Sequence, residues 1–515
     1  MKESYKNSLL GQVGIVPVIL ALALAGVSSG GENFDGFIGF FALILLAAGL
    51  IWVVWHIVRE EMPPKWLLLL TLAAALLRLG LGVLWHSGLP VWGYTNEEVQ
   101  QAGYLMKDAY QRDGIAWKLA QSDTPLYKAF AGISETDQYG GVLYLSAAVY
   151  RYFGGETHQS LMFVVLTAAF SSLAVIFTWA GAKHLWGEDI GRWAAWGIAL
   201  YPEAMMLGSV QMREPFLISI MAAGLYFLLR LSKSKALKDA AWLGGLVLFG
   251  AAISLPFAGM LALAAVVMGL YLEREMIFSG NRGWVVSGGL LALAAAIGLA
   301  LDHNFHWVQA VIKWQTYSSE KVSGRIAKMF LEMPEWAQQP FLVSYGVVRP
   351  LLPSALFDES VPLWKIVAVW RALGWTLLLL FLLYATFLIV KDRLWKESAS
   401  ILLLLNWTAV FIASFRGGGD LWDNPRYRAI FASIQVALAA WAWGRRKTSQ
   451  DPWLGRGLVM VLMLMAWFGP WYIQRKFFDL HWQIWELGDL VGLGLATGIL
   501  YLIWDWMRGI AVNNN

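Results

Sequence analysis

Long apolar stretches recur along nearly the whole chain, each of about 18 to 25 residues and separated by shorter polar segments. A helix needs about 20 apolar residues to cross about 30 Å of hydrocarbon, so each stretch predicts a transmembrane helix. About fourteen spans are expected, at 13–29, 36–57, 66–86, 160–182, 190–207, 214–231, 240–256, 258–272, 284–301, 366–390, 399–414, 429–444, 457–473 and 486–506. The pattern predicts an all-α polytopic membrane protein.

The composition agrees with this prediction and narrows it. Apolar residues make up 58% of the chain and charged residues 14%, against about 45–50% and about 25% in soluble domains. These values exclude an ordinary soluble domain, a coiled coil and a disordered chain. The absence of cysteine excludes a disulfide framework and a thiolate metal site. The net charge of +4 is modest, and no basic block indicates nucleic-acid binding.

Lysine and arginine are concentrated in alternate loops, which fixes the predicted orientation. The basic loops carry Arg59, Lys65, Lys183, Arg230, Lys233, Lys235, Lys238, Arg274, Arg282, Lys391, Arg393, Lys396, Arg445, Arg446, Lys447 and Arg456. The loops at 30–35 and 252–257 carry none. By the positive-inside rule, the basic loops and both termini face the cytoplasm of a cell that carries the protein in its plasma or inner membrane. Four basic residues lie on the other side against this rule: Arg426, Arg428, Arg475 and Lys476.

The orientation places most of the extra-membrane chain outside the cell, where no ATP or nucleotide sugar is available. Two loops on that side are long, and a third is short but dense in charge. The expected organisation is two additional N-terminal spans (1–64), a core (65–301) with the first external loop (87–159), a second external loop or lid (302–364), and C-terminal spans (365–515) with the external loop 415–428.

The first external loop is predicted to form two helices that lie on the membrane surface, with acidic residues at both ends. Tyr, Trp and Leu at helical spacing with few charges are typical of interfacial helices. The acids are Glu97 and Glu98 after the third span, Asp123 in a polar link, and Asp137 before the second helix. For any single one of them, a solvated loop charge is the simpler interpretation.

Arginines inside or at the mouths of spans are more informative, because a central charge costs about 2.5–3.5 kcal/mol on insertion scales. Arg78 lies within the third span, Arg213 and Glu214 open the sixth, and Arg371 lies near the external end of the tenth. Ion pairing or snorkelling to headgroups would account for each one separately. Together they indicate an anionic group at the external interface, where arginine can bind phosphate with two donors.

The second external loop contains two histidines, His303 and His306, at a spacing that could share a metal. No third ligand is evident, and an exposed amphipathic helix accounts for them better. The segment 311–333 alternates basic and apolar residues, which predicts a lid lying on the membrane.

The order of these features resembles the GT-C superfamily of membrane glycosyltransferases, and within it family 39, the protein O-mannosyltransferases and aminoarabinose transferases. The resemblance covers roughly residues 65–445. It rests on Asn96-Glu97-Glu98 after a span, Tyr-Arg-Tyr-Phe-Gly at 150–154, Trp186-Gly187, Ala-Leu-Tyr-Pro-Glu at 199–203, Arg213-Glu214, and Asn-Pro-Arg-Tyr-Arg at 424–428. The chain departs from the family at Asn-Glu-Glu, where aspartate is usual, and in having two additional spans, at 13–57, before the span that the loop follows.

The resemblance implies transfer of a sugar from a polyprenyl-phosphate carrier to an external acceptor, which is a protein, a lipid or a polysaccharide. The implied mechanism is a single displacement with inversion, in which Glu97 or Glu98 is the base, with Asp137 next and Asp123 as a rival. The residues expected to bind the donor phosphate and substrate are Arg78, Arg213, Glu214, Arg349, Arg426, Arg428 and Tyr139. Asp137 and Glu214 orient the acceptor or a divalent cation, Mg or Mn, in this scheme; metal dependence stays open and no residue is assigned as a ligand.

Two other classes of function are compatible with the sequence. A transporter or flippase for a lipid-linked sugar predicts an internal repeat and polar, broken spans, whereas the spans here are apolar apart from Arg78, Asn406 and Gln435. A non-catalytic subunit of an envelope glycan complex would tolerate glutamate in place of aspartate. A transfer assay with polyprenyl-phosphate sugars separates the enzyme from both alternatives.

Overall fold

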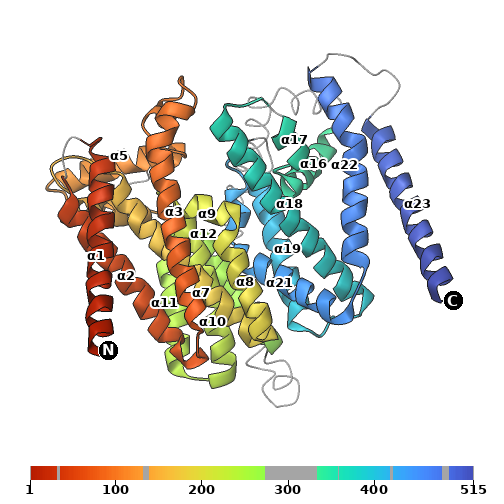
Figure 1. Cartoon of the computed structure of the whole chain (residues 1–515), viewed down its shortest axis with the longest axis horizontal. Helices are drawn as coiled ribbons and strands as arrows, with labels where there is room; N and C mark the ends of the chain where they lie inside the picture. The colour runs from red at the N-terminus through yellow and green to blue at the C-terminus, as the bar shows by residue number, and fades with distance from the viewer. Residues whose placement is uncertain are drawn as a thin grey trace. The chain divides into compact units, whose positions relative to one another are not determined.

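The computed structural model describes residues 2–31, 35–131, 139–272, 333–357, 359–417, 421–477 and 487–513. Within these ranges the regular structure is entirely helical (Figure 1). Nine helices of the described chain are long and apolar enough to cross a membrane: Phe37–Glu61, Lys65–Trp92, Leu161–Trp186, Glu214–Ser234, Leu255–Leu272, Pro362–Lys391, Ser398–Arg416, Trp453–Trp471 and Gly488–Asp505. The prediction of an all-α polytopic membrane protein is confirmed.

One predicted span, 190–207, is not a continuous helix. Helix α8 (Glu188–Leu200) ends before Tyr201, whose backbone is extended, and α9 (Pro202–Gly208) begins at the proline. Proline lacks an amide hydrogen and disfavours the helical conformation of the residue before it. Hydropathy alone therefore joined two short helices into one span. The predicted span 284–301 lies outside the described residues.

The chain divides into two compact units. Unit 1 comprises 1–347 and 404–437, and unit 2 comprises 348–403 and 438–515. In unit 1 the long helices are α1 (Lys2–Ser28), α2 (Phe37–Ile57), α3 (Lys65–Trp92), α7 (Leu161–Trp186), α10 (Glu214–Ser234), α11 (Leu237–Ile253) and α12 (Leu255–Leu272). Helix α7 is buried along almost its whole length and packs against α2, α3, α8 and α10. The first two helices therefore belong to the same packed unit as the core, because α2 rests directly on α7.

The described part of the loop after α3 contains four helical segments, whereas the sequence predicted two helices. They are α4 (Glu98–Gln101), α5 (Lys107–Gln121), a short 3-10 turn (Leu126–Phe130) and α6 (Gly141–Phe153). Helices α5 and α6 pack together, and Arg151 of α6 donates to the carbonyl oxygens of Leu119 at 2.5 Å and Ala120 at 3.2 Å. These carbonyls belong to the last turn of α5, where a helix has no acceptor partners of its own and favours a cation. Arg151 thus fixes the two loop helices to each other.

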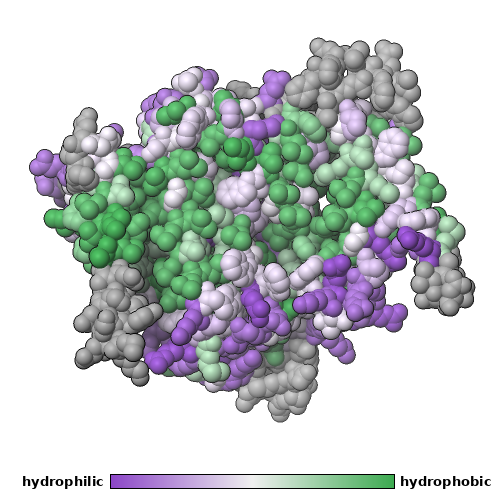
Figure 2. Space-filling view, in the orientation of Figure 1, coloured by the Kyte–Doolittle hydropathy of each residue, from purple (hydrophilic) through white to green (hydrophobic). Residues whose placement is uncertain are grey.

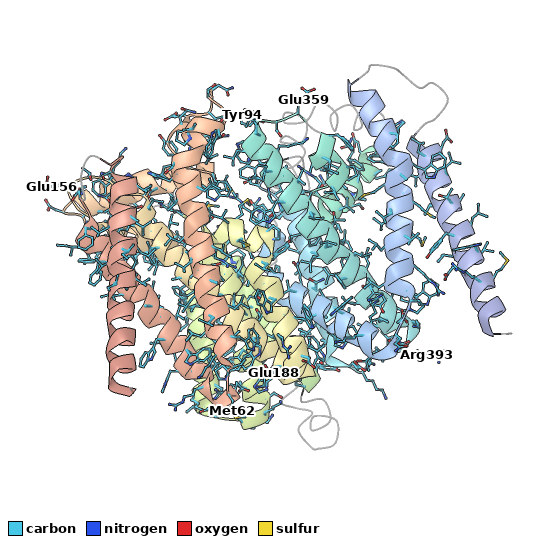
Figure 3. All side chains as sticks on the ribbon, in the orientation of Figure 1. Met62, Tyr94, Glu156, Glu188, Glu359 and Arg393 are labelled. Carbon is cyan, nitrogen blue, oxygen red and sulfur yellow. The ribbon has the colours of Figure 1, made fainter. Side chains whose placement is uncertain are left out.

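The loops of unit 1 meet at two ends, as Figure 3 shows. Tyr94 and Glu156 mark one end, and Met62 and Glu188 mark the other; we call these the Tyr94 end and the Met62 end. At the Tyr94 end the hydroxyl of Thr157 donates to Asp35 at 2.6 Å. At the Met62 end Arg230 pairs with Glu60 at 2.8 Å. Loops that the charge pattern placed on one side therefore contact one another.

Unit 2 consists mainly of α17 (Leu352–Phe357), α18 (Pro362–Lys391), α22 (Trp453–Phe477) and α23 (Leu487–Asn513), and α18 packs against α17 and α22. The boundaries between the units fall within three helices: α16 (Glu335–Val348), α19 (Ser398–Arg416) and α21 (Ala432–Ser449). Helix α20 (Arg426–Ala429) belongs to unit 1. On the face shown in Figure 2, hydrophobic residues gather in a band across the middle, and hydrophilic residues gather toward the two edges where the helices end. His303, His306 and the predicted lid 311–333, apart from its last residue, lie outside the described residues.

Candidate active site

Charged side chains from three separate segments of unit 1 form one group, which we call the acid–arginine cluster. Its members are Asp108, Arg213, Glu214, Asp423 and Arg426. Asp108 lies in the first turn of α5, Arg213 and Glu214 begin α10, and Arg426 begins α20. Acidic side chains are favoured at helix N-termini by the helix dipole, which suits the first-turn positions of two of these carboxylates.

Arg426 is the centre of the cluster. One terminal nitrogen lies 2.9 Å from Oδ2 of Asp108, and the other lies 3.3 Å from Oδ2 of Asp423. The Nε atom lies 3.9 Å from Oε1 of Glu214. The side chain of Arg426 is only 8% exposed, whereas that of Asp108 is 40% exposed. One carboxylate of the cluster is therefore both fixed by a guanidinium and accessible from outside the protein.

Arg213 approaches the same glutamate from another direction. Its Nε atom lies 3.8 Å from Oε1 of Glu214, and its guanidinium carbon lies 5.9 Å from the centre of the Tyr139 ring. Glu214 is fully buried, and its oxygens accept no hydrogen bond from the described part of the chain. A buried carboxylate is stable only if cations compensate it, and here two guanidiniums do so. Within the described ranges, the Arg213 guanidinium donates no hydrogen bond, so its donors are available to an anion.

The surroundings keep Arg426 charged. Burial by itself would lower the pKa of the Arg426 guanidinium, but the oxygen of Tyr427 and the three carboxylates of the cluster raise it by more. The pKa consequently lies well above its ordinary value. A fixed positive charge in a poorly solvated position interacts strongly with a negative charge that develops beside it.

A second network, centred on the buried Asp113, holds α5 in place next to the cluster. Asp113 is 1% exposed and accepts hydrogen bonds from the hydroxyl groups of Tyr104 and Tyr150. Its Oδ2 atom also lies 3.0 Å from Nε2 of His158. Burial raises the pKa of the Tyr150 phenol, and the negative charge of Asp113 raises it further, so the tyrosine stays a donor. The network ties α5 to α6 and to the segment before α7.

Arg112, also on α5, connects this helix to the segment that precedes Arg213. It is 3% exposed and donates to the carbonyl oxygen of Gln211 at 3.0 Å. Gln211 lies two residues before Arg213. The position of Asp108 relative to Arg213 is therefore set by contacts on both sides of α5.

The glutamates predicted as the base lie elsewhere on the loop. Glu97 and Glu98 are exposed, and within the described chain their carboxylates contact no arginine. Glu98 accepts a hydrogen bond from the hydroxyl of Tyr110 at 2.9 Å, and this bond raises the pKa of the tyrosine. Asp123 is exposed as well, and Asp137 lies outside the described residues.

Two of the predicted phosphate-binding arginines are occupied by the protein. Arg78 is fully buried and donates to the hydroxyl of Ser171 at 3.0 Å and to the carbonyl of Ile198 at 3.2 Å. Arg428 is 3% exposed and donates to the carbonyl of Gly346 at 2.8 Å. These contacts account for both side chains without a ligand. Arg349 belongs to unit 2 and is half-buried.

The structure thus brings together Arg213, Glu214 and Arg426 from the predicted set, with Tyr139 beside them, and adds Asp108 and Asp423. Two sequence signals could have found the added acids. Asp108 occupies the first turn of a predicted surface helix, and Asp423 precedes Arg426 by three residues, a spacing at which side chains on one helical turn meet.

The described residues contain no group of three histidine, aspartate or glutamate side chains placed to hold a metal ion. The acids of the cluster surround a guanidinium instead. Dependence of the reaction on a divalent cation, Mg or Mn, stays open.

Comparisons with known proteins give two distant structural neighbours. No family model matches the chain, and no curated protein sequence matches it. An oligosaccharyltransferase, AglB, from the archaeon Archaeoglobus fulgidus, solved with an inhibitory peptide and a dolichol-phosphate, aligns with 84% of this chain at 14% identity and a TM-score of 0.36. The apo form of the Archaeoglobus fulgidus oligosaccharyltransferase aligns with 85% at 15% identity and a TM-score of 0.37. The chain spans about half the length of these structures, 54% and 55%. A likeness of this degree carries no argument about function.

Proposed function

We propose that this protein is a membrane glycosyltransferase of the GT-C type. It transfers a sugar from a polyprenyl-phosphate carrier in the membrane to an acceptor at the Tyr94 end of unit 1, which faces the outside or the periplasm. The observation that carries the proposal is the pairing of the accessible carboxylate of Asp108 with the buried Arg426. Arg213, with available donors, lies in the same cluster.

The cluster contains the two kinds of group that the reaction needs. The leaving group is a lipid phosphate, whose negative charge grows as the bond from the anomeric carbon to the phosphate oxygen breaks. Arg213 and Arg426 supply fixed positive charge for that oxygen in a position of low solvent exposure. Glu214 is a positioning residue, because its buried charge attracts both guanidiniums to one place.

Asp108 is the proposed base. The acceptor hydroxyl attacks the anomeric carbon, its proton moves to the Asp108 carboxylate, and the electron pair of the broken bond leaves with the phosphate. A single displacement of this kind inverts the anomeric carbon. We favour Asp108 over Glu97 and Glu98 because Asp108 alone of the three contacts an arginine of the cluster. This contact matters because the base and the cation that stabilises the leaving phosphate must both lie within a few ångströms of the anomeric carbon.

The test is a transfer assay on the purified full chain in lipid nanodiscs, with radiolabelled polyprenyl-phosphate sugars as donors. Asp108→Asn should lower kcat by about 10²–10⁴-fold, the usual contribution of a general base. Arg213→Gln should raise KM for the sugar donor, because it removes guanidinium hydrogen-bond donors that can bind the phosphate. It should disturb the fold less than a change at Arg426, because Arg213 lies 3.8 Å from its carboxylate whereas Arg426 lies 2.9 Å from Asp108. Glu156→Gln is the matched control, an exposed acid of the same loop that should keep full activity.

The alternatives predict different outcomes in the same nanodiscs. Full activity of Asp108→Asn, with loss in Glu97→Gln or Glu98→Gln, would move the base back to the start of the loop. Movement of labelled lipid across the bilayer without sugar transfer would support a transporter. No transfer and no movement would support a non-catalytic subunit. Addition of EDTA, followed by Mg or Mn, tests metal dependence.

A further inference from the structure

A pocket of about 480 Å³ lies at the Met62 end of unit 1, far along the helices from the acid–arginine cluster. It is formed by the end of α2 with the following turn (Val58–Glu61), the last turns of α10, and the start of α11. In Figure 3, Met62 directly follows that turn and marks this end of the unit. The charge pattern of the sequence assigns this end to the cytoplasmic surface of the membrane.

The charges that line the pocket leave a surplus of positive charge. Arg230 pairs with Glu60 at 2.8 Å and with Asp239 at 3.2 Å, and Lys238 pairs with Glu60 at 3.1 Å. Arg59 also lines the pocket and is exposed, and its side chain forms no ion pair or hydrogen bond with the described part of the chain. Three cations therefore face two carboxylates, and the charge of Arg59 is uncompensated.

The other wall of the pocket is aromatic. The rings of Phe227 and Trp242 stack with centroids 5.6 Å apart and planes 14° from parallel. Trp242 is still 47% exposed. An amphipathic ring of this kind is typical of the headgroup level of a membrane. One cavity thus offers cations for a phosphate and an apolar face for the carbons attached to it.

We propose that this pocket binds the headgroup of an anionic phospholipid of the adjacent leaflet. The phosphate contacts Arg59 and Lys238, and the glycerol and upper acyl carbons lie against Trp242. Basic pockets between transmembrane helices on the cytoplasmic side bind anionic headgroups in this way. The bound lipid bridges α2 and α11, so it stabilises this end of the unit. The proposal does not depend on the glycosyltransferase function.

The experiment measures lipid binding to the full chain by native mass spectrometry and by the shift in melting temperature. The protein is purified in phosphatidylcholine nanodiscs or detergent, and phosphatidylglycerol, phosphatidylcholine or inorganic phosphate is added. Phosphatidylglycerol should bind and raise the melting temperature, and phosphatidylcholine should not. Arg59→Gln and Lys238→Gln should each weaken binding about fivefold, because each cation near the surface contributes about 1 kcal/mol.

Arg393→Gln and Lys65→Gln are the matched controls, since both residues are exposed basic residues outside the pocket and should leave binding unchanged. Trp242→Ala should weaken binding of phosphatidylglycerol but not of inorganic phosphate. Equal losses in the pocket variants and the controls would overturn the proposal, because they would show attraction to the whole basic surface. Inorganic phosphate that binds as tightly as the lipid, with no effect of Trp242→Ala, would overturn the assignment to a lipid.

Discussion

The buried Arg78 offers a direct test of whether an arginine within a span serves the fold or a ligand. Its donors reach the carbonyl oxygens of Ile198 at 3.2 Å and Ala199 at 3.4 Å, near the end of α8. They also reach the hydroxyl of Ser171 and the carbonyl of Ala74, both at 3.0 Å. Because α8 stops before a proline, its last carbonyls have no helical partner, and the guanidinium supplies one.

Replacement of Arg78 by methionine keeps most of the side-chain length and removes these donors. Each hydrogen bond from a charged donor is worth about 1.5–3 kcal/mol net, and loss of one partner of a buried charged group typically costs about 3–5 kcal/mol. Methionine also removes the cost of burying the guanidinium charge, which offsets part of the loss. The expected decrease in the free energy of unfolding of unit 1 is therefore about 3 kcal/mol. Lysine should give a smaller decrease, since it keeps the charge but cannot reach all these acceptors.

The assay is reversible unfolding by SDS in mixed micelles, followed by tryptophan fluorescence, with donor binding measured on the folded fraction. Arg192→Gln is the control, because Arg192 forms an exposed ion pair with Asp189 at 2.9 Å, and such pairs contribute about 0–1 kcal/mol. Our reasoning requires Arg78→Met to lose stability while its folded fraction binds donor normally. A variant as stable as wild type that no longer binds donor would show that Arg78 serves the ligand.

Three further changes test other contacts with the same unfolding assay. Asp113→Asn should lower the free energy of unfolding by about 3 kcal/mol, since it removes a buried charge that accepts two tyrosine hydrogen bonds; unchanged stability would contradict the network. Gly39→Ala should lower the free energy of unfolding by about 1–3 kcal/mol, because the new Cβ would collide with the last carbonyl oxygen of α6. Gly49→Ala in the same helix is the control: its Cβ would meet nothing within 4 Å, so the change should be neutral or stabilising. Burial raises the pKa of Asp451, but the hydrogen bonds from Lys391, the Trp453 amide and Tyr384, together with the charge of Lys391, lower it by more, so the folded pKa is below 3.8. The stability that Asp451 provides should be present above pH 3.8 and lost as the pH falls through the folded pKa, so wild type and Asp451→Asn should converge in acid and differ at neutral pH.

The helices were predictable because their signal is local. A run of apolar residues long enough to cross a bilayer specifies a helix at that place whatever else the chain does. Helices α3, α7 and α10 accordingly match the predicted spans 66–86, 160–182 and 214–231, and most of their ends lie within a few residues of the predicted ones. The break at Pro202 was also encoded locally, but in backbone geometry rather than in hydropathy. A window that averages hydropathy over 18 residues does not detect one missing amide hydrogen.

The grouping of charged residues was less predictable, because it depends on which side of each helix faces the core. Arg213, Glu214 and Arg426 were selected by their positions at the mouths of spans, and the structure places these three together. Among the acids of the first loop, the family resemblance pointed to Glu97 and Glu98, and Asp108 was not among the candidate bases. What turns Asp108 toward Arg426 is the burial of the next turn of α5, where Asp113 accepts hydrogen bonds from Tyr104 and from Tyr150 of α6. Those contacts join residues 9 and 37 positions apart, which no local pattern reveals.

The arginines of unit 1 show how a buried guanidinium can be assigned to the fold or to a ligand. Arg78 and Arg428 reach backbone carbonyls of neighbouring helices, acceptors that cannot move away without unfolding the unit. Arg426 is held by three carboxylates, so its charge is already more than balanced, and an incoming phosphate must compete with Asp108 for it. Arg213 differs from these three arginines, because it faces a single carboxylate. Its Nε atom lies 3.8 Å from Oε1 of Glu214, which is longer than a hydrogen bond. An anion therefore gains most by binding Arg213 first, and its charge then loosens the pair between Arg426 and Asp108. In this order, donor binding itself would release the carboxylate that the proposed reaction uses as its base.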